Sequence, residues 1–461
     1  AHIMDPGTVA LAELAIWREG GVPFYFATPV LCDGTAQNNA GMSYSLQSRN
    51  AIAEIVVNQM EAHSYHGAFV IQGCDKQPLG VVSALAHLDR LRRLRGEHPV
   101  YATFAPAHVL RGGTIPEDAM AELKEPAETA ERRGFGDIAE DIREAASYIL
   151  QCSSNTAFQG VLERAVGAGL LSPERHKALE KKLAVNTCDA KGGICAFHGT
   201  GNSSRDVTAG LGLVHPALEL LVEPPTQEQV DAAVKALFRM FTDPACSVAE
   251  LVRANIANAI RLHSAGGGSS NLVMHIVGAM MYAGYDFSLY DMEAILAEHP
   301  VPDLFDYSLT EGRDIFVLAA QCCAGQIRGM ETLMYELVRC GVPMDLDAPT
   351  AAGRTWRERL ADERGLPASG VKDNPIILDR PRRAFSGVDV LRGNFFESAV
   401  VKISGMPTRQ LDHFDEKAAF VLYFENEDAA NRALLDVRLL ERLRDARVFP
   451  AEAMIAMAFV N

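Results

Sequence analysis

The stretch "GAFVIQGCDKQPLGVVSALAHL", residues 67–88, joins a short apolar run to a longer one through a turn. The first run is typical of a buried strand, and the second has apolar residues at the spacing of a helix. Between them lie Cys74, Asp75 and Lys76. Three consecutive side chains cannot share one face of a strand or a helix, so they converge only where regular structure ends. The glycine before them and the "QPLG" after them mark such a turn.

The same order of strand, loop and helix recurs along the chain. "FYFATPVL", residues 24–31, reads as a strand that leads into the Gly- and Asn-rich loop 32–42. A helical pattern covers residues 45–63, and "PVYATFA", residues 99–105, reads as another strand. This rhythm predicts an α/β fold with a parallel sheet, in which chemistry gathers at the carboxyl ends of the strands.

Two segments depart from this rhythm. Residues 116–177 are charged, rich in alanine and without a strand candidate, which predicts a helical insertion. From about residue 386 the texture changes to short alternating runs such as "AVVKI" and "AAFVLYF". We therefore predict a large N-terminal parallel-sheet domain over residues 1–385. A smaller, mainly β and apparently incomplete C-terminal domain follows over residues 386–461.

The composition excludes several classes of protein. A net charge of −16 over 461 residues argues against nucleic-acid binding, which needs clustered Lys and Arg. No stretch approaches the roughly 18 consecutive apolar residues of a membrane span, and no secretory leader is visible. The nine cysteines form no CxxC pair, which is typical of a reduced, cytoplasmic protein.

Four Gly-rich loops could carry chemistry: residues 31–42, 73–80, 192–202 and 265–271. The dipeptide Cys-Asp occurs in the first two, after successive strand candidates. Neighbouring parallel strands end close together, so these residues could share one site. Thiolates suit iron and sulfur, whereas carboxylates suit Mg²⁺. The alternative is that the cysteines are buried small hydrophobes and the aspartates cap helices.

Four segments, in order, resemble the signatures of the dihydroxyacid and sugar-acid dehydratase family. They are "CDGTAQNNAGMSYSLQSRNAIA", "GCDKQPLG", "CAFHGTGNSS…GLGLVHP" and "GGGSSNLVMHIVGAMMYAG". The forms "CDG", "CAFHGTGN" and "GLVHP" are most similar to the 6-phosphogluconate dehydratase branch. The resemblance covers roughly residues 10–110 and 178–430. It implies removal of water from 2,3-dihydroxy acids by a homodimer that uses an iron–sulfur cluster and Mg²⁺.

The resemblance also implies ligands for both groups. Cys74 and Cys195 would hold the cluster, and we add Cys32 as a third thiolate. Thiolates hold [2Fe–2S] and [4Fe–4S] clusters alike, so the cluster type stays open. Iron with an open coordination position would act as a Lewis acid on the leaving hydroxyl.

The magnesium site implied by the resemblance consists of Asp33, Asp75 and Lys76, whose amine can be carbamylated. Its task would be to neutralise the enolate charge that develops beside the substrate carboxylate. Lys76 would thereby take part in catalysis. His198, which stands where relatives have tyrosine or glycine, could donate to the substrate or serve as a substitute base. The alternative for His198 is a packed, structural histidine.

Substrate contacts would come from two further places. Ser269, Ser270 and Asn271 would lie at a helix N-terminus, where free N–H groups favour a carboxylate. An ordinary helix cap is the alternative. Ser48 and Arg49 are also expected to contact the substrate, although Arg49 could instead form a structural ion pair.

Some family features are missing from the sequence. A "GMPE" glutamate and the serine base of a "DGRxSG" motif do not occur, and Cys152, within the expected insertion, reads as structural. The leading hypothesis is a hydro-lyase that converts a polyhydroxy acid, such as 6-phosphogluconate or a related aldonate, to a 2-keto-3-deoxy acid. The rivals are a dehydratase of another 2,3-dihydroxy acid, of the branched-chain type, and a repurposed homologue without the base.

Overall fold

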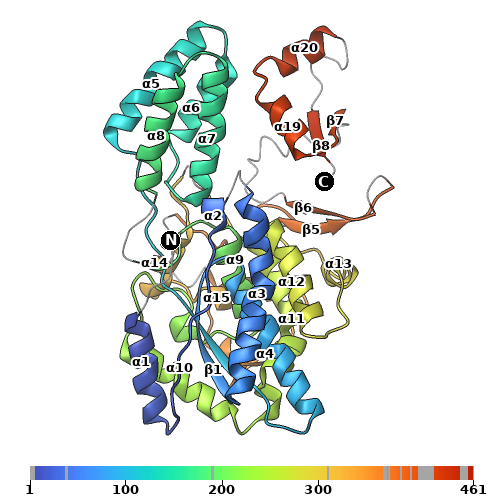
Figure 1. Cartoon of the computed structure of the whole chain (residues 1–461). Coiled ribbons are helices and arrows are strands. Elements are labelled where there is room, and N and C mark those ends of the chain that lie inside the picture. The colour runs from blue at the N-terminus through green and yellow to red at the C-terminus, as the bar shows by residue number, and fades with distance from the viewer. Residues whose placement is uncertain are drawn as a thin grey trace. The chain divides into compact units, whose positions relative to one another are not determined.

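The computed structural model forms two compact units (Figure 1). One comprises residues 1–112 and 188–405, and the other comprises residues 113–187 and 406–461. The predicted domain division at residue 385 stays a prediction. The structure describes residues 6–36, 40–187, 192–308, 311–366, 371, 374–384, 387–394, 397–402, 420–446 and 455–459.

A small parallel sheet lies within the larger unit. Strands β1 (Gly67–Gln72) and β2 (Tyr101–Pro106) pair in parallel, and helix α4 (Gln77–Leu94) connects them. Every residue of β2 is buried, which fits a strand that is covered on both faces. A parallel bridge between Phe104 and Val214 adds a third segment. The predicted α/β fold with a parallel sheet is thus confirmed in its coarse form, although helices dominate.

The strand predicted over residues 24–31 is wrong. This segment runs without strand pairing, and Phe24 and Tyr25 are 67% and 83% exposed. Pro23 and Pro29 interrupt it, and proline cannot donate the hydrogen bonds of a sheet. The prediction of a strand was wrong because it relied on apolar character alone.

Helices enclose the sheet of the larger unit and build one continuous apolar core. Helix α3 packs against α4, and α9 packs against α11 (Figure 1). The helices that frame the site described below are α2 (Asp33–Ala36), α3 (Gly41–Ala62), α9 (Thr200–Gly210), α11 (Val248–Ala265) and α12 (Ser270–Tyr282).

The remaining elements of this unit lie around that frame. Helix α1 packs on α10, and the β5–β6 pair is antiparallel. The elements are α1 (Pro6–Arg18), η1 (Pro216–Leu218), α10 (Gln227–Met240), η2 (Pro244–Cys246), α13 (Leu289–Ala297), α14 (Ile315–Cys323), α15 (Met330–Arg339), β3 (Pro349–Thr350), β4 (Arg354–Thr355), α16 (Trp356–Arg359), β5 (Val388–Leu391) and β6 (Ala399–Lys402).

The smaller unit has its own apolar core. Its first part is helical, as composition predicts for residues 116–177, and Leu123, Ile142 and Leu162 are buried there. Its second part pairs two parallel strands. The elements are α5 (Glu117–Arg132), α6 (Gly136–Ala145), α7 (Cys152–Gly167), α8 (Pro173–Val185), β7 (Phe420–Phe424), α19 (Glu427–Leu434), α20 (Leu439–Asp445) and β8 (Ile455–Phe459). Across the described parts of both units, we find no helix with the length and apolarity of a membrane span.

Candidate active site

Three buried thiols meet in the larger unit. Cys74 follows β1, Cys195 follows the bridge between Val109 and Ile194, and Cys32 precedes α2. All three are buried and free of disulfides. The hydrogen bond between Cys74 and Cys195, together with burial and the nearby charges, raises the pKa of the Cys74 thiol well above its usual value. Cys32 is one of those neighbouring groups.

Helix α9 can lie this close to the thiols only because it has a glycine at position 201. A Cβ added to Gly201, in the first turn of α9, would lie 2.5 Å from the Cys74 sulfur. Among the residues that the structure describes, no group of three or more His, Cys, Asp or Glu side chains is arranged so that it could hold a metal ion. The chemistry of the donors nevertheless fits an iron–sulfur cluster, because the buried Cys74 thiol has two further buried thiols, Cys195 and Cys32, among its neighbours.

The carboxylates and the lysine predicted to bind Mg²⁺ lie beside the thiols. Lys76, 1% exposed, donates to Oδ2 of Asp33. The backbone N–H of Asp33 donates to Oδ2 of Asp75 over 3.0 Å, and the Cys74 thiol donates to the same oxygen over 3.3 Å. Burial, and then the charge of Asp33, raises the pKa of Asp75 to about 7. Two neighbouring buried carboxyl groups, of which only Asp33 is paired with Lys76, have the chemistry that suits a hard divalent cation such as Mg²⁺.

The turn after β1 explains how three consecutive side chains reach one site. Asp75 has φ of +49°, in the left-handed region that aspartate tolerates better than most residues. The Gln77 side chain accepts a hydrogen bond from the N–H of Gly73 over 2.8 Å, which closes the turn. The reversal at Asp75 brings Cys74 and Lys76 to the same side of the chain.

The loop before α12 supplies one direct contact to this cluster. Asn271 donates to Oδ2 of Asp33 over 3.2 Å. Ser269 shares a hydrogen bond with the hydroxyl of Thr200 over 3.0 Å, whereas Ser270 is exposed. The structure therefore brings Asn271 into the cluster and Ser269 to its border. Their contact with a substrate stays a prediction.

Ser48 and Arg49 lie on α3 and bond elsewhere. The Ser48 hydroxyl donates to the carbonyl of Ser45 over 2.7 Å. Arg49 donates to the Asn50 side chain and to Nδ1 of His275, over 3.2 Å in the latter case. These hydrogen bonds do not involve Asp33, and contact of Ser48 and Arg49 with a substrate stays a prediction.

The family model described as "Dihydroxy-acid/6-phosphogluconate dehydratase N-terminal" matches residues 2–92 and 105–359 of this chain. The chain belongs to this dehydratase family. The family prediction made from the loop motifs is thus confirmed, and the match includes every residue predicted for the site.

Curated relatives of this dehydratase-family chain carry the name dihydroxy-acid dehydratase. The protein of Caldanaerobacter subterraneus subsp. tengcongensis is 28% identical over 93% of this chain and 67% of its own length. Those of an Anaeromyxobacter species and of Picrophilus torridus are each 27% identical, over 88% and 95% of this chain. The chain spans 62% and 68% of the length of these last two relatives.

His198, expected in this family member as a substitute base, is tightly packed. It stacks on Phe305 with ring centroids 4.9 Å apart, and its Nε2–H donates to the carbonyl of Gly266 over 2.7 Å. Burial lowers the pKa of His198 to about 3, so the imidazole is neutral at physiological pH. This is the packed arrangement that the sequence left open, and a role as base stays a prediction.

Sequence reasoning missed several side chains of the dehydratase-family site. The Ser45 hydroxyl donates to Oδ1 of Asp33 over 2.6 Å. The Asn202 amide donates to the carbonyl of Cys195 over 2.6 Å and so fixes that loop. His275, on α12, is buried beside the charges of Lys76 and Asp33. The spacing Asn271–His275, one helical turn, was the available signal for the last of these.

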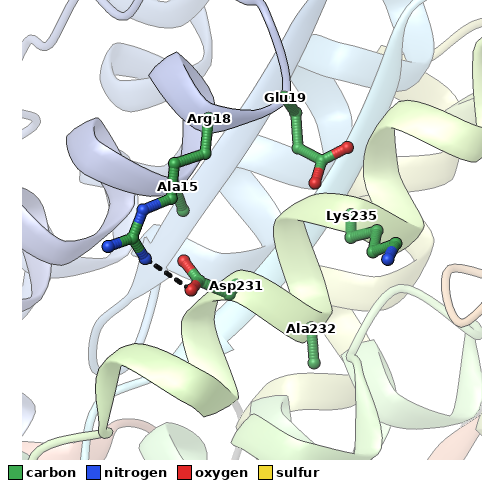
Figure 2. A pocket seen from close by; sticks show the side chains of 6 residues that line it. All are labelled: Ala15, Arg18, Glu19, Asp231, Ala232 and Lys235. Atoms are coloured by element: carbon green, nitrogen blue, oxygen red, sulfur yellow. Dashed lines mark hydrogen bonds and ion pairs between the residues drawn. The ribbon is translucent and has the colours of Figure 1, made fainter.

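The larger unit contains two other features that could be mistaken for a site, a hollow and a network of charged side chains, and neither includes a cysteine. A hollow of about 240 Å³ lies between α1 and α10 (Figure 2). Its charged side chains neutralise each other, as in the ion pair of Arg18 with Asp231 at 2.6 Å. The six residues that line it are Ala15, Arg18, Glu19, Asp231, Ala232 and Lys235.

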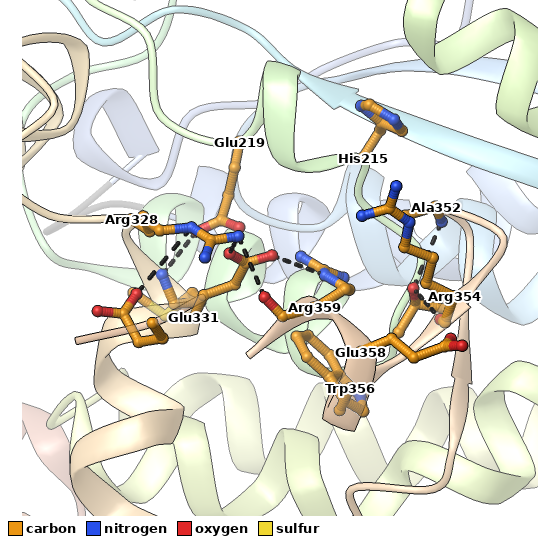
Figure 3. A network of polar contacts seen from close by, with 12 residues as sticks. His215, Glu219, Arg328, Glu331, Ala352, Arg354, Trp356, Glu358 and Arg359 are labelled. Atoms are coloured by element: carbon orange, nitrogen blue, oxygen red, sulfur yellow. Dashed lines mark hydrogen bonds and ion pairs between the residues drawn. The ribbon is translucent and has the colours of Figure 1, made fainter. Parts of the chain in front are cut away.

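The second feature, the Glu331 network, consists of Glu219, Arg328, Glu331 and Arg359 (Figure 3). Arg359 donates from Nε to Glu331 over 2.7 Å, and Arg328 pairs with the other oxygen of Glu331. Glu219 accepts the N–H of Met330 over 2.7 Å, and burial raises the pKa of Glu219 to about 7. With two carboxyl and two guanidinium groups, the network balances its own charge.

Proposed function

We propose that the chain dehydrates a 2,3-dihydroxy acid of the sugar-acid class, such as 6-phosphogluconate or a related aldonate, to a 2-keto-3-deoxy acid. The observation that carries this proposal is the meeting of sulfur and oxygen donors at one turn, around Cys74 and Asp75. The family to which the chain belongs supports the reaction type.

Cys32, Cys74 and Cys195 would hold the iron–sulfur cluster. When bound, the cluster supplies a Lewis acid for the departing hydroxyl group. The chain shields this step from water, because all three thiols are buried and Gly201 lets α9 approach Cys74 closely.

Asp33, Asp75 and Lys76 would hold Mg²⁺, with Lys76 carbamylated. Carbamylation would turn the Lys76 amine, now a donor to Asp33, into an acidic oxygen ligand. Ser45 and Asn271 each donate to one oxygen of Asp33, which fixes the orientation of that carboxylate. The cation would offset the negative charge that develops when the proton beside the substrate carboxylate is removed.

A second candidate substrate class is a branched-chain 2,3-dihydroxy acid. The curated relatives favour it through their name, dihydroxy-acid dehydratase. The motifs "CDG" and "GLVHP" favour the sugar acid instead. Turnover of a panel containing 6-phosphogluconate, D-gluconate and 2,3-dihydroxyisovalerate, measured as 2-keto acid formed, separates the two classes.

The test of the function itself begins with anaerobic purification of the full chain. We expect brown protein with iron and sulfide in near-stoichiometric amounts, and 2-keto acid formation from one of the acids. Protein that stays colourless and iron-free after reconstitution would contradict the proposal and favour the repurposed homologue.

We further propose a homodimer in a reducing compartment, the cytoplasm. Large apolar side chains on α1, α3 and the segment between them are exposed, as an interface would require: Trp17, Phe24, Tyr25 and Tyr44. Cys74, Cys195 and the other cysteines that the structure describes form no disulfide with one another. Light scattering of the purified chain tests the dimer, and a monomer at micromolar concentration would contradict it.

A further inference from the structure

His275 lies on the side of α12 that faces the candidate site. It follows Asn271 by four residues, so the two side chains share one face of the helix. Asn271 donates to Asp33, and the charges of Lys76 and Asp33 act on His275. The His275 side chain is buried, at 2% exposure. Burial, and then the charges of Lys76 and Arg49, lowers the pKa of His275 to about 3, so the ring is neutral.

The tautomer of this neutral ring follows from its contact with Arg49. The Arg49 guanidinium lies 3.2 Å from Nδ1 of His275. A guanidinium has donors and no acceptor, so Nδ1 must carry the lone pair and Nε2 must carry the proton. Within the described part of the chain, Nε2 is buried and has no hydrogen-bond partner.

Two features hold Arg49 in place. Its Nε and Nη2 donate to Oδ1 of Asn50 over 3.2 and 3.0 Å. Its guanidinium also lies flat against α12 at Gly278, where an added Cβ would come within 2.2 Å of Nη1. Only glycine at position 278 leaves room for this arrangement. The protonation of His275 is thus fixed from outside the site by a residue on α3.

A buried donor without an acceptor is unfavourable by an amount comparable to a lost hydrogen bond, and such groups call for an explanation. His275 is close enough to Lys76 and Asp33, which belong to the site of the proposed reaction, for their charges to act on it. An oxygen of an anionic hydroxy acid is the acceptor that this position would meet. A neutral donor also suits a site for Mg²⁺ better than an imidazolium, which would repel the cation.

We propose that Nε2–H of His275 donates a hydrogen bond to an oxygen of the bound hydroxy acid, and that Arg49 is the positioning residue that holds this tautomer. The inference rests on the proposed function for the class of ligand. It replaces direct substrate contact by Arg49 with an action through His275.

The first test reads the tautomer directly. Imidazole NMR spectra of ¹⁵N-histidine-labelled full-length protein, with His275 assigned by the loss of its signals in His275→Gln, should show protonation at Nε2. The Nε2 signal should shift when D-gluconate or 2,3-dihydroxyisovalerate is added with Mg²⁺. Protonation at Nδ1, or no shift with either acid, would overturn the proposal.

The second test uses matched variants. His275→Phe, without a donor, should weaken binding of the acid by about ten- to a hundredfold, whereas His275→Gln, which keeps an amide donor, should stay within about threefold of the native chain. The change should appear in KM more than in kcat, because the bond exists before and during the reaction. His299→Gln, at an exposed imidazole on another part of the unit, is the control and should have no effect.

Arg49→Met completes the set. It should loosen the ring and give two exchanging forms of His275, with an intermediate loss of affinity that Arg49→Lys partly restores. A folded His275→Phe variant that binds the acid as the native chain does would refute the inference. Failure of the proposed function has a different signature, namely colourless protein without dehydration. The tautomer of His275 is measured independently of that outcome.

Discussion

Two buried charged clusters lie in the larger unit, and they differ in how their charges balance. In the Glu331 network, Arg328 and Arg359 flank one carboxylate from both sides. At the turn after β1, Lys76 pairs with Asp33, its charge also acts on Asp75, and two further thiols, Cys195 and Cys32, act on Cys74. The carboxyl groups of both clusters are buried, so burial alone does not distinguish a site from a structural network.

The difference teaches where to look for a ligand. The Glu331 network holds as many cations as anions and needs no partner for its charge. The turn after β1 has a single lysine for two carboxyl groups, and burial with the neighbouring charges raises the pKa of the Cys74 thiol and of Asp75. Metal ions act against these shifts, because they bind the deprotonated forms. The predictions below perturb the two clusters separately.

The largest effect is expected at the thiols. Cys74→Ser should abolish the brown colour and lower turnover more than a hundredfold, since a hydroxyl is a poor substitute for a thiolate ligand of iron. Iron per chain and visible absorbance measure the loss. Cys152→Ser, in α7 of the smaller unit, should change neither, and a loss of iron in that variant would overturn its assignment as structural.

Removing one partner of a buried ion pair should affect stability in both clusters. Lys76→Met and Glu331→Gln should each lower the free energy of unfolding by about 3–5 kcal/mol, because each leaves buried charge uncompensated. Denaturant titration with and without Mg²⁺ then separates the clusters. Mg²⁺ should recover part of the loss in Lys76→Met, since it binds the folded state. It should recover none in Glu331→Gln, and equal recovery in both would erase the distinction.

The pH dependence of the Glu331 network follows from Glu219. Its pKa rises from 4.5 in the unfolded chain to about 7 in the folded protein, so its stabilising contribution is complete below pH 4.5. That contribution is lost as the pH rises through 7, by up to about 3 kcal/mol. Glu219→Gln should remove this part of the pH dependence and be more stable than the native chain at pH 8. Melting curves at pH 5 and pH 8 test it, and an unchanged slope would refute the shift.

The smallest effect is expected from a single methyl group. Gly201→Ala should displace the Cys74 sulfur and speed the loss of iron to a chelator about tenfold. The matched control is Gly160→Ala, in α7, where an added Cβ meets nothing within 4 Å. That change should stabilise its helix by about 0.5–1 kcal/mol. If Gly201→Ala retained iron like the native chain, the sulfur would have more space than the structure gives it.

Much of the fold and part of the site could be predicted from the sequence. The strand at β1, the turn and α4 were predicted because the apolar spacing and the turn residues agree there. The strand over residues 24–31 was not correct, because prolines outweigh apolar character. Cys32 therefore lies near Cys74 without a preceding strand. The sequence predicted this proximity from the ends of two neighbouring strands, and the first of those strands is not formed.

The side chains that were missed share a physical cause. Ser45 and His275 lie within regular helices, where a polar residue at one position has no local signature of what it faces. Their partners, Asp33 and Arg49, are distant in sequence. Loop motifs can be recognised in a sequence by their glycine and turn residues. The role of a residue on a helix face depends instead on which other element packs against it.

The left-handed conformation of Asp75 has a consequence for laboratory evolution. In a library with every amino acid at position 75, expression of folded protein should favour only glycine, asparagine and aspartate, which adopt this conformation with little strain. Selection for catalysis should then retain aspartate alone. Two separate filters thus act on one codon, and sequencing the library after each selection would tell them apart.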